Sequence, residues 1–595
     1  LLFTLAKRDE SNLEIAAKQY GLAFNVIDSL RATYSERSSK LDKADEYADL
    51  FEGAIECYFQ LGKAEGRNYQ SNLFELFEKD KSLLLLEALN ETFAQQFAGI
   101  PEEVLAKEQY LKAELAVLDE EKFYENQMGP DKDEAIINDL NGQIFDLKKQ
   151  LNSFSNQLEQ DYPEYYKLKY SWNINSLSEV QESLSADEIM LTFYVGNENS
   201  YVLFISNDDS WVHKYESIQT EELGQQIVAL REGIYSYFLL SSSEQDQETY
   251  QSYLTVYQQA AFELYETLFV PIEKELTGKR LILIPDGVLG YVPFDALLSS
   301  KPNSDAALKD YDYLIKQFNL AYSYSASSLL RFKELKTSNN LKSLLAFAPS
   351  FEEQGEALAS RRIRGVLTPL KYNVSEVEAI KALVRGDIVT GQEATKDAFL
   401  EKAPDYSILH LSTHGKANDK VGDFSYLAFA KGAGTVDESL LYVRDLYTLN
   451  LNADMVVLSA CETGIGELQN GEGIASLSSG FSYAGAKNII TTLWSVNDAQ
   501  TKDLINRFYS LLTEGIDKAT ALQKAKLNYI NEVPKAKSHP FYWSGFISIG
   551  DQEKINFSTS PSLINLLLYF APFLIIIFIA IGGVSIIRKN TTNFF

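Results

Sequence analysis

Two apolar runs that end in reactive side chains decide the fold of this chain: ILHLSTHG at residues 408–415 and VVLSACETG at residues 456–464. Short runs of this kind are typical of strands buried in a parallel sheet. His414 and Cys461 each come just after the apolar part of a run. The carboxyl ends of parallel strands lie at one edge of a sheet, where open α/β sheets bind ligands. We therefore expect the imidazole and the thiol to meet there, although 47 residues separate them.

Short apolar runs alternate with helical segments on both sides of this pair. Further strands are expected at residues 281–284, 344–347 and 488–493, and helices at 375–383, 394–400, 473–484 and 499–512. Such helices supply the crossovers that parallel strands need. Upstream, the runs at 189–195, 201–205 and 211–215 predict an antiparallel meander. The sequence thus predicts an α/β sandwich, with a mostly parallel sheet flanked by helices.

The residue types at the strand ends suit nucleophilic catalysis. Thiolate is the nucleophilic form of cysteine, and a neighbouring imidazole lowers the thiol pKa or accepts its proton. This chemistry gives His414 and Cys461 the catalytic roles. Loops after strands expose unpaired N–H groups, so we expect the amides of Gly415 and Cys461 to form an oxyanion hole.

Other chemistries fit the same residues less well. A metal site built from His410, His414 and Cys461 is disfavoured because strand residues four apart lie about 13 Å from each other, too far to share one ion. His410 is instead expected to be a buried strand residue. The segment GFSYAG at 480–485 has one residue too many for the G-x-S-x-G elbow of serine hydrolases, and no GxxxxGK[ST] phosphate loop occurs. Cys57, within a helical run, is expected to pack in a core.

The two runs closely resemble the CHAT domain, a relative of caspases and separase. Supporting motifs follow in the family's order at LIPDG 283–287, VPFDAL 292–297, YSAS 324–327, GQEAT 391–395 and HPFYW 539–543. The resemblance covers Tyr165 to Gly550 and implies a caspase-like cysteine endopeptidase. It assigns the catalytic dyad to His414 and Cys461, both of which are intact. It implies no cofactor and no metal.

The segment LWSVND at 493–498 resembles the part of separase whose aspartate reads a basic residue before the cleaved bond. This resemblance implies that Asp498 selects Arg or Lys, by a charge-assisted pair. An N-cap role for the helix that follows is the alternative. Trp494 is expected to line the adjacent groove, or alternatively to pack in the core.

The first 160 residues have helical spacing of their apolar side chains. They resemble degenerate tetratricopeptide (TPR) repeats, and an ordinary helical bundle is the alternative. The expected domains are TPR-like repeats at 1–100, long helices at 101–164, the CHAT domain at 165–550, a linker at 551–562, a transmembrane helix at 563–587 and a tail with a basic start at 588–595.

Charge and hydropathy set the expected surroundings of the chain. The formal net charge of -29 repels phosphate backbones, so no nucleic acid is expected as a partner. The uncharged apolar run at 563–587 is long enough to cross a bilayer. Arg588 and Lys589 follow it, which by the positive-inside rule places the large domains outside the cytoplasm. The sequence therefore predicts a single-pass, C-terminal membrane anchor.

Two functions follow from these observations. The first is a membrane-anchored, conditionally active cysteine endopeptidase that cleaves proteins or peptides and is regulated by a protein partner on the helical repeats. The alternative is a catalytically silent scaffold for protein–protein interaction at a membrane.

Overall fold

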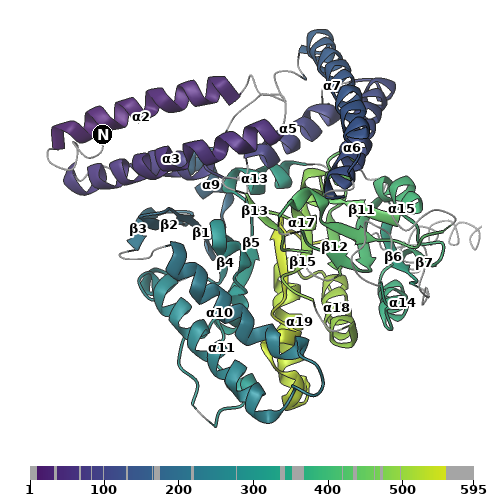
Figure 1. Cartoon of the computed structure of the whole chain (residues 1–595). Helices are drawn as coiled ribbons and strands as arrows, with labels where there is room; N and C mark the ends of the chain where they lie inside the picture. Colours follow the sequence, from purple (N-terminus) through teal and green to yellow (C-terminus); the bar gives the residue numbers. More distant parts are fainter. Residues whose placement is uncertain are drawn as a thin grey trace, which may run out of the picture. The chain divides into compact units, whose positions relative to one another are not determined.

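An 11-stranded sheet forms the centre of the protein in the computed structural model (Figure 1). The structure describes residues 10–31, 37–65, 69–81, 83–97, 100–128, 132–163, 165, 174–215, 220–276, 278–303, 305–335, 342–351, 367–418, 420–432, 439–460, 463–469, 473–495 and 498–557. Residues 1–555 form one compact unit, and 556–595 form a second, of which 556 and 557 are described.

The strand order in the sheet is β3-β2-β1-β4-β5-β16-β15-β12-β8-β6-β7. These strands are β1 (Glu188–Val195), β2 (Ser200–Ile205), β3 (Ser210–Tyr215), β4 (Arg280–Ile284), β5 (Asn319–Tyr322), β6 (Lys342–Pro349), β7 (Gly386–Gly391), β8 (Tyr406–Ser412), β12 (Met455–Ser459), β15 (Asn488–Thr492) and β16 (Phe546–Gly550). The meander β1–β2–β3 and the β15–β16 pair are antiparallel, and the other neighbours are parallel. The predicted mostly parallel sheet and its upstream meander are confirmed.

Helices cover both faces of the sheet, and strand β8 shows how its side chains divide between them. Leu409 and Leu411 join a buried cluster with Phe399 and Phe481. His410 contacts helices on the opposite face, because successive side chains of a strand alternate. One face is covered by helices that include α14 (Asn373–Leu383), α18 (Asp498–Thr513) and α19 (Lys518–Glu532). The other is covered by helices that include α13 (Ala326–Glu334), α15 (Lys396–Lys402) and α17 (Leu477–Tyr483) (Figure 1).

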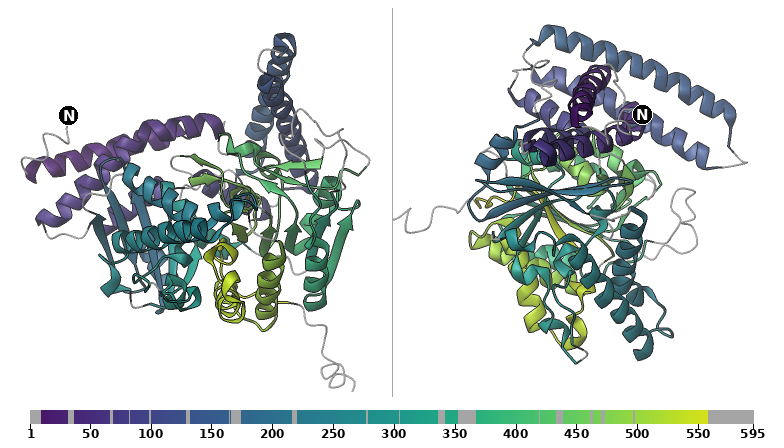
Figure 2. Two further views of the ribbon diagram at one scale, coloured as in Figure 1. Left: turned by 60° about the horizontal axis from the view of Figure 1, so that its bottom comes forward. Right: turned by 90° about the vertical axis from the view of Figure 1, so that its left-hand side faces the viewer.

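The N-terminal region is helical, as predicted, and part of it belongs to the core of the sheet. Its helices are α2 (Glu10–Arg31), α3 (Arg37–Glu65), α4 (Gln70–Lys79), α5 (Leu83–Phe97), α6 (Glu102–Gln127) and α7 (Glu134–Asp161). Phe51 and Phe77, from α3 and α4, share one buried cluster with Met190, Tyr201 and Ile282 of the sheet. Figure 2 shows these purple helices lying across the strands β1 to β3. The domain boundaries expected from the sequence stay predictions.

Buried carboxylates attach α3 and α4 to defined points of the sheet region. Glu52 accepts hydrogen bonds from the backbone N–H groups of the β1–β2 turn, at Asn197 (2.9 Å), Glu198 (2.8 Å) and Asn199 (2.7 Å). Glu78 accepts from the first backbone N–H groups of α13, at 2.9 and 2.7 Å. A carboxylate at a helix N-terminus satisfies donors that have no partner within the helix. These contacts fix the position of the helices on the sheet.

One predicted helix begins later than the sequence indicated. Residues Gly473–Ala475, expected as the start of a helix at 473–484, form strand β14 instead, paired with β13 (Glu467–Gln469). Helix α17 then begins at Leu477, because the Ser476 side chain accepts from the Ser479 N–H as its N-cap. Residues 473–475, which precede the cap, can therefore pair with residues 467–469 as a β-hairpin.

The predicted membrane localisation is wrong on the present findings. Within the part of the chain that the structure describes, no helix combines the length and apolarity needed to span a bilayer. The run at 563–587, on which the single-pass anchor rested, lies outside the described residues. The prediction rested on the apolarity and the length of that run alone.

Candidate active site

The carboxyl end of β8 positions His414. Strands β8 and β12 are parallel neighbours, and the last pair in their register is Ser412 with Ser459. His414 comes two residues after Ser412 of β8, and Cys461 comes two residues after Ser459 of β12. The expected convergence of the two strand ends at one sheet edge is therefore present. Cys461 itself lies outside the described residues.

Contacts with strand β10 (Tyr426–Ala428) hold the backbone around His414. The Thr413 hydroxyl donates to the Ala428 carbonyl, and the Ala428 N–H donates to the His414 carbonyl at 2.9 Å. Gly415 then begins the short strand β9 (Gly415–Lys416) and pairs with Leu427. The imidazole is thus attached to a hydrogen-bonded turn at the end of a buried strand.

The His414 ring has a defined orientation. Its Nε2 lies 2.7 Å from the Thr368 carbonyl oxygen, and its ring centroid is 4.8 Å from that of Phe351. A carbonyl oxygen only accepts hydrogen bonds, so Nε2 carries the proton in this contact. In the neutral ring Nδ1 is then the acceptor, which is the form that a general base requires.

The chain on both sides of 461–462 is tied to the end of β15. The Thr492 hydroxyl donates to the Ala460 carbonyl at 2.7 Å, and the Gly464 N–H donates to the Thr492 carbonyl at 2.7 Å. The buried Thr463 hydroxyl contacts the Thr491 hydroxyl at 2.9 Å. A Cβ on Gly464 would lie 3.0 Å from the Thr492 oxygen, so glycine allows this close approach. Both ends of the cysteine segment are therefore anchored to one strand.

The two residues expected to bind substrate lie near the end of β15. Trp494 is buried, with 3% of its surface exposed, and its indole N–H donates to the Phe541 carbonyl at 3.0 Å. This placement matches the core-packing role that the sequence left open. Asp498 is the first residue of α18, and its side chain lies outside the described part of the structure.

His410 is a buried strand residue, as predicted. It is fully buried, with Nε2 2.9 Å from a Glu376 oxygen and Nδ1 3.3 Å from the Tyr509 hydroxyl. Glu376 comes from α14 and Tyr509 from α18, so the ring joins the two helices on that face. Both ring nitrogens are occupied by side chains, which leaves neither for catalysis.

The other cysteine and the histidine of the HPFYW segment are also buried. Burial raises the pKa of Cys57 to about 11, and its thiol donates to the Leu13 carbonyl at 3.4 Å. Cys57 is therefore a core residue, as predicted. Burial lowers the pKa of His539 to about 3, and its Nδ1 accepts from the Phe541 N–H at 3.2 Å.

Sequence reasoning missed the Thr368 carbonyl and the Thr463–Thr491–Thr492 contacts. A backbone carbonyl has no sequence signature, and Thr368 is 46 residues from His414 along the chain. Thr491 and Thr492 could have been noticed in the sequence, because two polar side chains are unusual at the end of an otherwise apolar strand, 488–493.

The motifs and strand ends described above fall within one family model. Residues 258–551 match the CHAT domain. The match begins later than the predicted Tyr165, so the strands β1 to β3 lie outside the matched residues. These strands belong nonetheless to the same sheet as the matched ones.

Two curated relatives are tetratricopeptide repeat proteins. The chain is 25% identical over 343 residues to tetratricopeptide repeat protein 28 of Mus musculus, and 26% identical over 348 residues to that of Homo sapiens. Each alignment covers 50% of this chain and 13% of the relative. The chain therefore spans a small part of the length of the relatives that it matches.

Solved structures similar to this chain include a separase–securin complex and a cysteine proteinase. The separase–securin complex of Saccharomyces cerevisiae matches with a TM-score of 0.43 and 10% identity, covering 88% of this chain and 38% of that chain. The Arg-specific cysteine proteinase gingipain R matches with a TM-score of 0.32 and 9% identity, covering 56% of this chain and 75% of that chain.

Proposed function

We propose that this chain is a cysteine endopeptidase in which Cys461 is the nucleophile and His414 the general base. The register of β8 and β12 is the observation that carries the proposal. The two strands end at the same edge of the sheet with Ser412 paired to Ser459, so the segments that lead to His414 and Cys461 begin side by side. The CHAT domain match over 258–551 supports the same assignment.

The orientation of His414 supports its role as the base. With Nε2–H held by the Thr368 carbonyl, Nδ1 accepts the proton of the Cys461 thiol. The thiolate attacks the scissile carbonyl carbon, and the peptide C–N bond breaks as His414 returns the proton to the leaving amine. Water then hydrolyses the thioester, which releases the second product and restores the thiol.

The oxyanion formed in each step needs backbone donors. We assign them to the amides of Gly415 and Cys461, which follow the two strand ends. The hydrogen bonds of Thr413 and Gly464 to neighbouring strands support this assignment, since a rigid backbone positions donors without reorganisation. We propose that Asp498 selects a basic residue before the cleaved bond. Trp494 is proposed to support the wall of the substrate groove next to Asp498.

The helical region is proposed to regulate this site on binding a protein partner. The buried Lys81, after α4, forms an ion pair with the partly buried Asp286 at 2.8 Å. Both residues line a small cavity of about 70 Å³ together with Gly464 of the cysteine segment. A shift of α4 would therefore reach the loop that carries the nucleophile.

Labelling with a thiol-reactive peptide probe tests the peptidase. The probe carries Arg or Asp next to the reactive group, and wild type is compared with Cys461→Ala and His414→Ala, with and without protein partners from the native source. Arg-probe labelling that both variants abolish would support the dyad and Asp498. Labelling by the Asp probe alone would keep the dyad and reject Asp498. Absence of Cys461 labelling under all conditions would favour the silent scaffold.

A further inference from the structure

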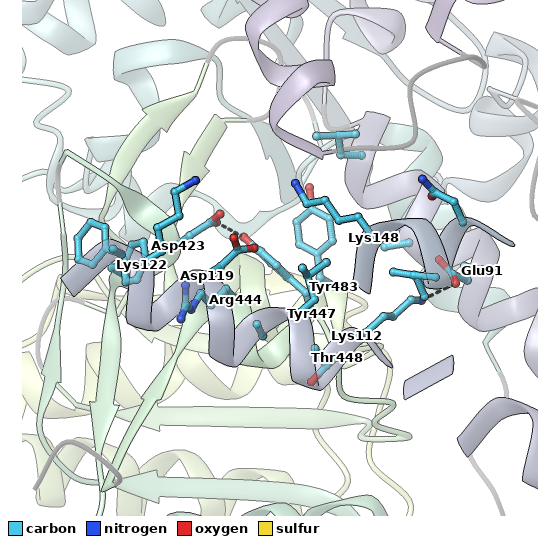
Figure 3. Close-up of a pocket in the computed structure, with 18 of the residues that line it drawn as sticks. Glu91, Lys112, Asp119, Lys122, Lys148, Asp423, Arg444, Tyr447, Thr448 and Tyr483 are labelled. Carbon is cyan, nitrogen blue, oxygen red and sulfur yellow. Dashed lines mark hydrogen bonds and ion pairs between the residues drawn. The ribbon is translucent and has the colours of Figure 1, made fainter. Parts of the chain in front are cut away.

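A large cavity lies between the helices α5, α6 and α7 and the strand-bearing part of the chain. Its volume is about 670 Å³, within the range of roughly 300–1,000 Å³ that small-molecule sites occupy. We call it the helix-junction cavity. Its walls include Leu84, Leu115 and Leu151 from the helices and Phe424, Arg444 and Tyr483 from the sheet region. Figure 3 labels Arg444 and Tyr483 among the residues that line it.

Side chains near the middle and near the end of α6 fix the walls of the cavity. At one end Phe123 stacks on Phe424, with ring centroids 3.4 Å apart, and Tyr124 shares a hydrogen bond with Tyr442. Near the middle of α6, Lys112 pairs with Glu91 at 2.7 Å. Because aromatic and ionic contacts fix α6 at two separate points, the space between them is part of the fold.

Arg444 gives the cavity a buried, incompletely paired cation. Its residue is 8% exposed, its guanidinium stacks on the Phe424 ring at 4.4 Å, and its nearest carboxylate, that of Glu120, lies at 3.5 Å. Nη2 makes this ion pair but no hydrogen bond, and Nε has no hydrogen-bond partner. Buried donors without acceptors are costly, so an acceptor in the cavity would be strongly favoured.

The remaining charges of the lining are of both signs and favour a ligand with a single anionic group, since Glu91, Asp119 and Asp423 line the cavity together with Lys112, Lys122 and Lys148. Lys122 also lines the cavity, and its ammonium has no ion-pair partner among the residues that the structure describes. Asp119 and Asp423 line it too, with Asp423 accepting from the Tyr447 hydroxyl at 2.8 Å. These carboxylates disfavour a ligand with negative charge along its whole length, such as a nucleic acid.

We propose that the helix-junction cavity binds a small organic acid, with its one anionic group at Arg444 and Lys122 and its apolar body against Leu84, Leu115 and Leu151. The leucines supply the apolar contact area and the cations supply orientation, which is the usual division in small-molecule sites. The site lies outside the proposed dyad, so its occupancy is measurable without any peptidase activity.

Two fluorescent probes of the same shape test the proposal. The 595-residue chain is titrated with 8-anilinonaphthalene-1-sulfonate, which carries one sulfonate on an apolar body, and with N-phenyl-1-naphthylamine, which lacks the sulfonate. We expect Arg444→Leu and Lys122→Glu each to weaken sulfonate-probe binding roughly tenfold, the effect of losing a charge-assisted contact. Binding of the uncharged probe should stay within about twofold, because its apolar contacts remain.

Lys149→Glu is the matched control, since it makes the same charge change at an exposed position of α7 that does not line the cavity. It should leave both probes unchanged. Equal loss of both probes in Lys122→Glu, or equal weakening by Lys149→Glu, would overturn the proposal, as would unchanged sulfonate binding in Lys122→Glu. Lys122→Glu decides the outcome alone if Arg444→Leu does not fold.

Discussion

The interior of strand β8 and its carboxyl end each hold a histidine, and the two differ in what surrounds them. His410 is fully buried, with Glu376 and Tyr509 on its two nitrogens. His414, four residues later, is half-buried and held through one nitrogen by the Thr368 carbonyl. The comparison teaches that the end of the strand, rather than the residue type, makes an imidazole available for chemistry.

Replacing His414 should have the largest effect on function. We expect His414→Gln to lower the rate of probe labelling at Cys461 by about 10²–10⁴-fold, the range for loss of a general base. The midpoint of urea unfolding should stay close to that of wild type, because the side chain is half-buried. Unchanged labelling would contradict the assignment of the base.

Replacing His410 should instead act on stability. His410→Leu leaves the buried Glu376 side chain without its imidazole partner, and we expect a loss of about 1–3 kcal/mol in the free energy of unfolding. The double variant His410→Leu/Glu376→Met should recover most of that loss, because both polar groups are then removed. If the single variant loses labelling but not stability, the two histidines have been assigned the wrong way round.

A third histidine, His539, should make the stability of the protein depend on pH. The pKa of His539 is lowered to about 3 by burial, so the unfolded chain binds a proton between about pH 6.5 and 3 that the folded chain does not. Burial of His539 therefore costs no stability above about pH 6.5. As the pH is lowered below that value the free energy of unfolding decreases, by about 2 kcal/mol at pH 5. His539→Asn should flatten this part of the stability–pH curve while keeping an acceptor for the Phe541 N–H.

The smallest expected effect is that of the second contact to His410. Tyr509→Phe removes the hydroxyl that lies 3.3 Å from Nδ1, and we expect a loss of about 1 kcal/mol, typical of one hydrogen bond. Thermal unfolding with calorimetric detection would measure it. A loss as large as that in His410→Leu would show that the Tyr509 hydroxyl, not Glu376, is the main partner of the ring.

The sequence predicted the strands whose apolar runs are long enough to stand out, such as β8 and β12, and the order of their reactive ends. It did not predict β5 or β16, because four or five residues carry little pattern when polar side chains such as Asn319 and Ser548 interrupt them. Residues 473–475 form a strand because they pair with residues 467–469. The local sequence pattern, which predicted a helix there, contains no information on that pairing. His414 could be proposed as a site residue because a sequence motif surrounds it. Its contact with the Thr368 carbonyl has no sequence pattern and arises only when the chain folds.

The shared core between α3, α4 and the sheet bears on how such proteins diversify. Phe51 and Phe77 share a buried cluster with strands that follow more than a hundred residues later, and Glu78 caps the N-terminus of α13, inside the CHAT-matched region. A gene rearrangement that joined new helices at residue 164 would leave these side chains without partners. Recombination that preserves the fold must therefore inherit α3 and α4 together with the sheet, as a single exchangeable block.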